Sequence, residues 1–484
     1  MRICFVISEV APFSKSGGLG DVGRALSDVL ARRGHDVVVI SPAYGQVIPH
    51  ADATGLRFSV PAGGRDHELS VMAPRVETGP RHRFIAHPVF ERDGMYGDAN
   101  GAFGDNHFRF TLLCRGALEV AHRELGWSDE PVLFHVHDWQ TALLPVLLDA
   151  AYRPVGRFEK AASVLSLHNP AHQGRLPASL FVDLELPARW FTPPHLEFYG
   201  DLSLLKGGLV HADQLTTVSP TFATEIVEPG GGFGLEDVLA GRADDLTGIL
   251  NGVDLDEWDP TTDTDLPATF DRDDLTGKAV CKAELQVELR LPVDPDAPLF
   301  GSVGRLDPQK GVDILIDSVP WMVEQGAQIV VLGTAAAAHR RYEAAWKNLE
   351  RRFPNNVRAW IGFSEAVAHR VEAASDFFLM PSLFEPCGLN QFYSQRYGTP
   401  PIVRRTGGLA DSVVEGPQGT GFVFGAPHGK ALRDAVYRAL ALFRDDPEEM
   451  VRLRQRCMDL DRSWDLPATA YEQVYERALE GRRP

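Results

Sequence analysis

The stretch FLMPSLFEPCGLNQ, residues 378–391, decides the predicted fold of the second half of the chain. It starts as a short apolar run that stops at Pro381, which is typical of a buried strand that meets a loop. Glu385 follows as a single carboxylate with apolar neighbours. A helix is predicted over 389–397, and a second apolar segment leads into a glycine pair within 401–409. This order is typical of a parallel α/β sheet, which binds ligands at the carboxyl ends of its strands. An ordinary βαβ unit with a surface glutamate would give the same pattern.

The composition is that of a globular protein with two domains. The chain has 484 residues, of which 44% are hydrophobic and 24% charged. Its formal net charge of -18 argues against nonspecific binding to nucleic acid and against docking on anionic membranes. Its five cysteines are scattered without a CxxC pair, which favours a reducing cytoplasm over a disulfide framework. No apolar run reaches the length that spans a membrane.

The first half begins with the same order of strand, loop and helix. An apolar strand is predicted over 3–7, a glycine-rich loop over 12–21 and an amphipathic helix that ends at Gly34. Such loops offer backbone N–H groups to anions. The loop matches neither GxGxxG nor a P-loop, because Lys15 precedes the glycines. A tight turn with a solvated lysine is therefore the alternative interpretation.

Two more apolar strands of the first half end in polar segments, HVHDWQ at 135–140 and HNPAHQG at 168–174. Parallel strands open at one edge, so we expect Lys15, Asp138 and His168 to lie near one cleft. A metal site at the two histidines of 135–137 is less favoured than structural histidines, because two histidines and one carboxylate are too few. Polar residues over 95–110 could bind hydroxyl groups or serve as caps and loops.

A second doubly wound sheet is predicted from strands at 299–303, 329–332, 357–361 and 377–380. The loop GRLDPQKG at 304–311 carries Arg305 and Lys310, which suit a pyrophosphate, although solvated charge is the usual alternative. Residues 256–275 are interpreted as a linker. Three DxD triplets are interpreted as solvated turns rather than as metal ligands; they lie at 254–256, 263–265 and 294–296.

Nine segments occur in one order across nearly the whole chain. They are KSGGLGD (15–21), DNHFRF (105–110), HVHDWQT (135–141), HNPAHQG (168–174), TVSP (217–220), GILNG (248–252), GRLDPQKG (304–311), FEPCGL (384–389) and TGGLAD (406–411). Each segment alone is a weak signal, whereas the ordered set is specific. It resembles glycosyltransferase family 5, which contains the bacterial glycogen synthases and the plant starch synthases.

The resemblance implies an α/β protein with the GT-B fold, in which two Rossmann-like doubly wound domains face each other across a deep cleft. It implies an N-terminal glucan-acceptor domain at 1–247, a nucleotide-sugar-binding domain at 248–460 and a C-terminal helix at 461–484 that packs back on the first domain. The implied activity is transfer of glucose from ADP-glucose to the non-reducing end of an α-1,4-glucan, with retention at the anomeric carbon. No cofactor and no metal ion are implied.

The resemblance also implies roles for single residues. The two cations implied to neutralise the leaving diphosphate are Arg305 and Lys310. The carboxylate implied to contact glucose is Glu385. The two groups implied to bind sugar hydroxyls are His168 and Asp138. Side chains and amides that bind ADP-glucose are Lys15, Gly17, Gly18, Arg305, Lys310, Glu385, Cys387, Gly388, Leu389, Gly407 and Gly408. Residues that contact the acceptor or other sugar hydroxyls are Tyr96, Asn106, His168 and Asn169.

Two positions depart from the family's usual pattern. Ser203 stands where asparagine is common, and Leu383 stands where arginine is common. These departures leave room for a different nucleotide sugar or acceptor, or for a glucan-binding homologue with weak catalysis. A phosphorylase dependent on pyridoxal phosphate shares the architecture, but the sequence has no specific motif for the cofactor lysine. The oligomeric state is not indicated.

Overall fold

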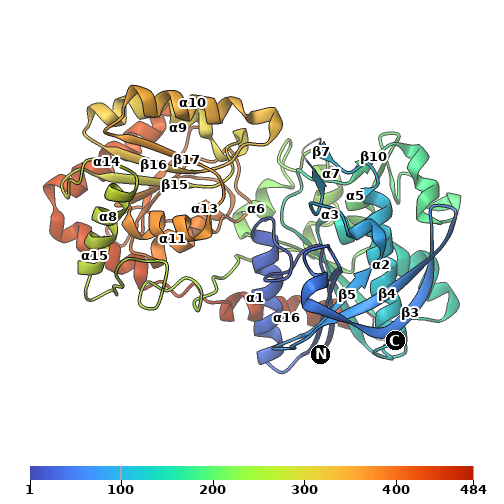
Figure 1. Ribbon diagram of the computed structural model, residues 1–484. Coiled ribbons are helices and arrows are strands. Elements are labelled where there is room, and N and C mark those ends of the chain that lie inside the picture. Colours follow the sequence, from blue (N-terminus) through green and yellow to red (C-terminus); the bar gives the residue numbers. More distant parts are fainter. Residues whose placement is uncertain (99–100, 483–484) are drawn as a thin grey trace. The chain divides into compact units, whose positions relative to one another are not determined.

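The computed structural model describes residues 1–98 and 101–482, and the chain divides into two compact units (Figure 1). The N-terminal unit comprises Met1–Gly252 together with Trp464–Pro484, and the C-terminal unit comprises Val253–Ser463. The chain therefore passes between the units twice. Among the described residues, none of the helices combines the length and the apolar character that crossing a membrane requires.

The N-terminal unit is built on one nine-stranded sheet in the order β14-β13-β9-β8-β1-β2-β5-β4-β3. Seven of its strands run parallel, and their continuous apolar sequences follow from burial on both faces. These strands are β1 (Arg2–Val6), β2 (Asp36–Pro42), β5 (Arg81–Ala86), β8 (Val132–His137), β9 (Ala162–Leu167), β13 (Gln214–Thr217) and β14 (Leu246–Gly248).

The mixed region after β2 adds two antiparallel strands to this sheet, β3 (Ala51–Ala62) and β4 (Arg65–Pro74). β4 also pairs antiparallel with β5. β5 also pairs with β2, so the insertion is part of the main sheet. Short strands outside the sheet are β6 (Gly97–Asp98), β7 (Gly101–Ala102), β10 (Arg175–Leu176), β11 (Glu197–Phe198) and β12 (Asp201–Ser203).

Helices cover both faces of this sheet. On one face α1 (Gly18–Arg32) lies beside α16 (Asp465–Glu480), which packs on β8, β9 and β13 although it is the last helix of the chain (Figure 1). Its buried side chains include Tyr471 and Tyr475. The other helices of the unit are α2 (Asn106–Arg123), α3 (Asp138–Thr141), α4 (Leu143–Leu147), α5 (Leu204–His211), α6 (Pro220–Glu225) and α7 (Glu236–Ala240).

The C-terminal unit has a six-stranded parallel sheet in the order β17-β16-β15-β18-β19-β20. The order reverses between β15 and β18, and in the N-terminal unit it reverses between β1 and β8. Ligands of such sheets bind at these reversals. The strands are β15 (Leu299–Val303), β16 (Gln328–Gly333), β17 (Val357–Ile361), β18 (Phe377–Met380), β19 (Pro401–Arg404) and β20 (Phe422–Phe424).

Helices again lie on both faces of the second sheet, with α9, α10 and α14 on one face and α8 and α11 on the other (Figure 1). The sheet with its helices is the doubly wound arrangement that the sequence predicts. The helices are α8 (Thr276–Glu288), α9 (Val312–Glu324), α10 (Arg341–Arg352), α11 (Glu365–Ala374), α12 (Asn390–Arg396), α13 (Gly407–Ser412), α14 (Gly429–Asp445) and α15 (Pro447–Met458).

One carboxyl group in the interior of the C-terminal unit is poorly solvated. Glu372 on α11 has no exposed surface. Its Oε1 atom accepts only a long hydrogen bond of 3.4 Å from Asn390 Nδ2, and no described residue bonds to Oε2. Burial raises the pKa of Glu372 well above its usual range, so the folded protein keeps this group protonated.

We expect the Glu372→Gln variant to gain stability over the wild type as the pH rises. The unfolded chain releases the Glu372 proton at a pKa of about 4.3, whereas the folded chain retains it, so wild-type stability falls by about 1.4 kcal/mol per pH unit through this group. Urea unfolding of both proteins from about pH 4 to about pH 8 measures the difference. The matched variant Glu448→Gln, whose side chain is 85% exposed, should show no such trend. A constant difference for Glu372→Gln across this range would contradict the expectation.

Candidate active site

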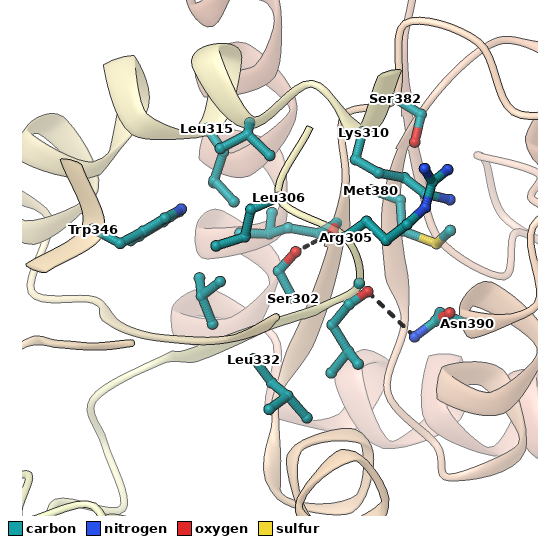
Figure 2. A pocket seen from close by; sticks show the side chains of 15 residues that line it. Ser302, Arg305, Leu306, Lys310, Leu315, Leu332, Trp346, Met380, Ser382 and Asn390 are labelled. Atoms are coloured by element: carbon teal, nitrogen blue, oxygen red, sulfur yellow. Dashed lines mark hydrogen bonds between the residues drawn. The ribbon is translucent and has the colours of Figure 1, made fainter. Parts of the chain in front are cut away.

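A cavity of about 60 Å³ lies in the C-terminal unit where the strand order reverses between β15 and β18. Figure 2 shows Arg305, Lys310 and Ser382 on one side of it and Leu306, Leu315 and Trp346 on the other. Arg305 and Lys310 come from the loop after β15, and Ser382 comes from the loop after β18. The cavity therefore lies where a doubly wound sheet binds ligands.

An ion pair joins these two loops. Lys310 Nζ lies 2.6 Å from Glu385 Oε2, and Ser382 Oγ donates a hydrogen bond of 3.0 Å to the same oxygen. Glu385 is only 4% exposed, and no hydrogen bond from a described residue reaches its other oxygen. The sequence neighbours of Glu385, Phe384 and Pro386, are apolar, whereas its partners in the structure are polar. Its cation comes from 75 residues earlier in the chain and is invisible in the local sequence.

The loop that carries Lys310 is itself held in place. Asp307 accepts a hydrogen bond from the backbone N–H of Lys310 and forms an ion pair of 2.9 Å with Arg305. The carbonyl of Gln309 accepts a bond of 2.7 Å from the N–H of Leu383. The Arg305 side chain is 59% exposed, so its charge faces the open edge. Sequence reasoning missed Asp307, Gln309 and Ser382, although an aspartate three residues before Lys310 is a capping signal.

The glycine pair after β19 packs directly against the loop that carries Glu385. Gly407 has a φ of 43°, and a Cβ atom there would lie 2.1 Å from the carbonyl oxygen of Glu385. A Cβ atom at Gly408 would lie 2.2 Å from the carbonyl oxygen of Cys387. The N–H of Gly408 donates to the carbonyls of Glu385 and Pro386 at 3.1 Å. In the structure the Gly408 amide therefore holds the loop that carries Glu385, and a hydrogen bond from it to a diphosphate stays a prediction.

The remaining predicted donor residues of this unit lie between the loop and α12. Cys387 is buried, and Gly388 makes the turn with a φ of 73°. Leu389 precedes the first residue of α12. Gln391 Nε2 donates to the carbonyls of Cys387 and Gly388 and so closes this turn. The structure thus brings together all the C-terminal residues predicted to bind the donor.

In the N-terminal unit, a buried carboxylate organises the loop after β1. Glu9 accepts hydrogen bonds from the N–H and the hydroxyl of Ser16 and from the Tyr96 hydroxyl. Burial raises its pKa. Lys15 forms an ion pair of 2.9 Å with Asp21, while Gly17 and Gly18 are exposed at the start of α1. Sequence reasoning gave Glu9 no role, although it lies three residues after the apolar strand β1.

Asn106 is held by hydrogen bonds inside the N-terminal unit. Only 7% of it is exposed, its Nδ2 atom donates to the carbonyl of Tyr96 at 2.8 Å, and its Oδ1 atom accepts from Arg109 at 2.7 Å. Both ends of the amide are therefore used inside the protein. Asn106 thus holds the segment of Tyr96, and a sugar contact from Asn106 stays a prediction.

The loops after β8 and β9 are joined through Asp138. Its Oδ1 atom accepts hydrogen bonds from the N–H groups of His168 at 2.7 Å and Asn169 at 3.3 Å. Asp138 has a φ of 52°, a left-handed conformation that is uncommon outside glycine. Burial raises the pKa of Asp138 to about 7 and lowers the pKa of His168 to about 4. The structure thus places the backbone of His168 and Asn169 against the carboxyl group of Asp138, whose pKa is near neutral pH.

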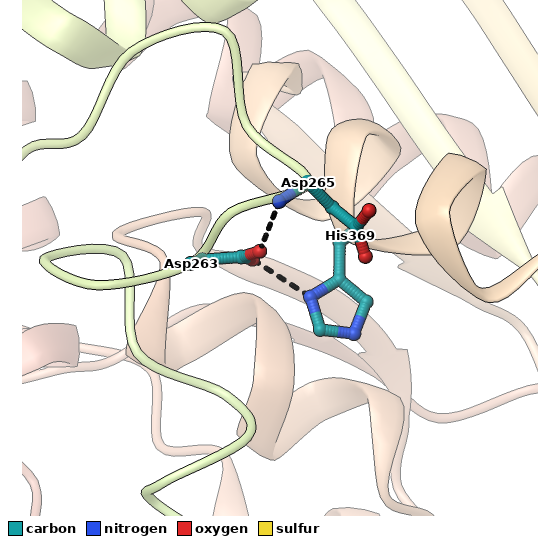
Figure 3. Close-up of side chains that lie close together, drawn as sticks. All are labelled: Asp263, Asp265 and His369. Carbon is teal, nitrogen blue, oxygen red and sulfur yellow. Dashed lines mark hydrogen bonds and ion pairs between the residues drawn. The ribbon is translucent and has the colours of Figure 1, made fainter.

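One of the three DxD triplets is not a solvated turn. Asp263 is buried and accepts a hydrogen bond from His369 Nδ1 at 2.7 Å (Figure 3). It accepts a second one from the Tyr397 hydroxyl. It also accepts the N–H of Asp265, so protein donors already occupy both carboxylate oxygens. This carboxylate anchors the linker to α11 and to the residue that follows α12. Asp294 and Asp296 are exposed, as predicted.

Comparison with known proteins identifies the family to which this chain belongs. The model of the starch synthase catalytic domain matches residues 2–241, and that of glycosyl transferases group 1 matches residues 289–456. The glycogen synthase of Anaeromyxobacter dehalogenans (strain 2CP-1 / ATCC BAA-258) is 45% identical over 489 residues, which cover 100% of both chains. The chain belongs to the glycogen and starch synthase family. The resemblance seen in the sequence is confirmed.

Other members of the glycogen and starch synthase family match over the same length. Soluble starch synthase 1 of Oryza sativa subsp. indica is 41% identical. The match covers 99% of this chain and 78% of the starch synthase. The catalytic domain of starch synthase IV from Arabidopsis thaliana, solved with ADP and acarbose, superposes with a TM-score of 0.90 at 34% identity and 99% coverage of both chains. This match, together with the two doubly wound sheets of the present chain, confirms the predicted GT-B fold. A sucrose-phosphate synthase from Thermosynechococcus elongatus, 18% identical with a TM-score of 0.61, shares the fold alone.

We expect Lys310 and Glu385 to be energetically coupled. Lys310→Met leaves a buried carboxylate without its cation, whereas the double variant with Glu385→Gln removes that charge as well. The loss of unfolding free energy in the double variant should therefore be smaller than the sum of the single losses, by at least about 1 kcal/mol. Urea unfolding measures all four proteins. The exposed pair Lys430 and Asp434 on α14 is the control, with an expected coupling below about 0.5 kcal/mol. Strictly additive losses at Lys310 and Glu385 would contradict the coupling.

Proposed function

We propose that the protein transfers glucose from ADP-glucose to the non-reducing end of an α-1,4-glucan, with retention at the anomeric carbon and release of ADP. The observation that carries the proposal is the ion pair between Lys310 and Glu385 beside Arg305, at the strand reversal of the C-terminal unit. We propose that this unit binds the nucleotide sugar and that the N-terminal unit binds the glucan. We also propose that the protein acts in the cytoplasm, where its five free cysteines would stay reduced.

The charges of the C-terminal site suit the departure of ADP. Negative charge grows on the diphosphate as the bond to glucose breaks, and a positioned cation stabilises that state. Arg305 and Lys310 supply two cations on one loop. Lys310 has three N–H donors, so its ammonium can keep the bond to Glu385 and still donate to a phosphate oxygen. In this proposal the two cations do the work of a metal ion at the leaving group.

Glu385 suits the sugar side of the same reaction. Its Oε2 atom is held by Lys310 and Ser382, which fixes the orientation of the carboxylate. We propose that Oε1 contacts the glucose and stabilises the positive charge that develops at its anomeric carbon. Because the group is nearly buried, that attraction acts in a medium of low dielectric constant and is stronger than in water.

In the N-terminal unit, we propose that Asp138 and His168 bind hydroxyl groups of a sugar. Asp138 has one oxygen engaged by the amides of His168 and Asn169, which leaves Oδ2 as an acceptor for a hydroxyl. Tyr96 is a further candidate, since its hydroxyl meets Ser8 and Glu9 on the loop after β1. The roles of Lys15, Gly17 and Gly18 toward the donor stay predictions.

Incubation of the protein with ADP-glucose and glycogen should release ADP and lengthen the glucan chains. Lys310→Ala and Glu385→Ala should each lower kcat by at least about 100-fold, the scale for loss of a group that stabilises charge in the transition state. The exposed lysine variant Lys430→Ala should keep the wild-type rate. Wild-type rates in either site variant would refute the role of that residue, and equal or faster turnover of UDP-glucose would refute the choice of donor.

The pKa of Asp138 predicts a pH dependence of the reaction. This group is protonated below about pH 7 and ionised above it, and an ionised carboxylate accepts stronger hydrogen bonds from hydroxyl groups. We expect kcat/KM to rise with pH up to about 7 and to level off above it. The Asp138→Asn variant keeps an acceptor oxygen but has no proton to lose, so the rise should vanish. Steady-state kinetics from about pH 5 to about pH 8.5 test this, and an unchanged rise in the variant would exclude Asp138 as its source.

A further inference from the structure

Three histidine rings form a column inside the N-terminal unit. His135 and His137 lie on β8 with ring centroids 4.1 Å apart, and the ring of His168, just after β9, lies 5.3 Å from that of His137. At the inner end, His135 Nδ1 lies 2.9 Å from the Tyr475 hydroxyl of α16. At the outer end, His168 is partly exposed at the carboxyl edge of the sheet. The column thus links the last helix of the chain to the site.

A single hydrogen bond joins the two outer rings. The distance from His137 Nδ1 to His168 Nε2 is 3.0 Å, so one of these nitrogens carries the proton and the other accepts it. Burial lowers the pKa of His137 well below its usual value and that of His168 to about 4. Both rings are therefore neutral at pH 7, and each carries one proton.

The surroundings of His137 decide where these protons lie. Its Nε2 atom is buried, and no described residue offers it a hydrogen bond. The ring packs instead on Phe5, at 4.3 Å between centroids, and on His135. If His168 were the donor, the His137 proton would be on Nε2 as a buried N–H without an acceptor. Such N–H groups are rarer in proteins than buried acceptors that lack a donor, so His137 Nδ1 is the favoured donor.

We propose that His137 is a positioning residue that fixes the tautomer of His168, so that His168 carries its proton on Nδ1 and presents an N–H donor to the substrate. His168 Nε2 is then used as an acceptor inside the protein. No described residue bonds to His168 Nδ1. In this tautomer His168 donates to a hydroxyl oxygen, whereas the neighbouring Asp138 accepts. A sugar hydroxyl group can both donate and accept a hydrogen bond, which matches this pair. That last step rests on the proposed function; the tautomer does not.

Nuclear magnetic resonance of the full chain labelled with ¹⁵N-histidine tests the tautomer directly. Long-range ¹H–¹⁵N correlation separates protonated from bare ring nitrogens, and the His168 signals are identified by their loss in His168→Gln. At pH 7 the wild type should show a protonated Nδ1 and a bare Nε2 in His168. The reverse pattern in the wild type would overturn the proposal without any need for a His137 variant.

Two His137 variants test the cause. In His137→Asn the side-chain amide can replace the Nδ1–H donor, so His168 should keep its tautomer. His137→Leu provides no donor, so no hydrogen bond holds His168 Nε2 bare, and the Nε2–H tautomer that a free histidine side chain prefers should appear. Tyr475→Phe removes the hydroxyl at the far end of the column and is the matched control, with no expected change at His168. An unchanged His168 in His137→Leu would overturn the proposal. Circular dichroism checks that each variant is folded.

Kinetics with ADP-glucose and glycogen test the consequence. His137→Leu should lower kcat by about 10-fold to 100-fold with little change in KM for ADP-glucose, and His137→Asn should stay within about 5-fold of the wild type. Equal rates for the two variants would overturn the positioning role. If the wild type shows the expected tautomer but releases no ADP, the proposed function fails while the assignment of the tautomer stands.

Discussion

The ion pair between Lys310 and Glu385 is the interaction on which the C-terminal site depends. It holds together two loops that are 75 residues apart in the sequence and that follow adjacent strands of the sheet. The surrounding contacts hold these two loops in position. Asp307 caps the turn of Lys310, Gln309 accepts the N–H of Leu383, and the glycine pair at 407–408 allows the close approach of a neighbouring helix. Removing a charged pair from water costs free energy, and good geometry with additional hydrogen bonds offsets that cost. The contacts of Asp307, Gln309 and the glycine pair maintain this geometry.

In the N-terminal unit, two buried carboxyl groups are held by uncharged hydrogen-bond donors. Asp138 ties two loops through backbone N–H groups rather than through a cation, and burial raises its pKa. Glu9 is held in the same way by Ser16 and Tyr96. The histidine column behind these loops is neutral throughout. The C-terminal site thus centres on fixed positive charge, whereas the loops after β8 and β9 offer a carboxyl group and neutral histidine rings.

Several predicted residues have a supporting role that the family pattern did not reveal. The amides of Asn106 and Gly408 are consumed inside the protein, where they hold the segments that carry Tyr96 and Glu385. Asp263 was interpreted as a solvated turn because its neighbours in the linker are polar. In the structure it is buried against His369 and Tyr397, more than one hundred residues away in the chain. A polar local sequence does not reveal a partner that only folding brings near.

The sequence by itself determined the fold class and the location of the site. Apolar runs followed by glycine-rich or charged loops identify parallel strands, and parallel strands place those loops at one edge of a sheet. The ordered segments identify the family. Only the tertiary structure decided which polar groups face a ligand and which face each other. Hydrogen bonds and ion pairs between distant segments depend on distances of a few ångströms, and strand and helix patterns carry no information about those distances. The proton between His137 and His168 is the clearest case, because its position depends on a nitrogen whose lack of a partner appears only in the packed interior.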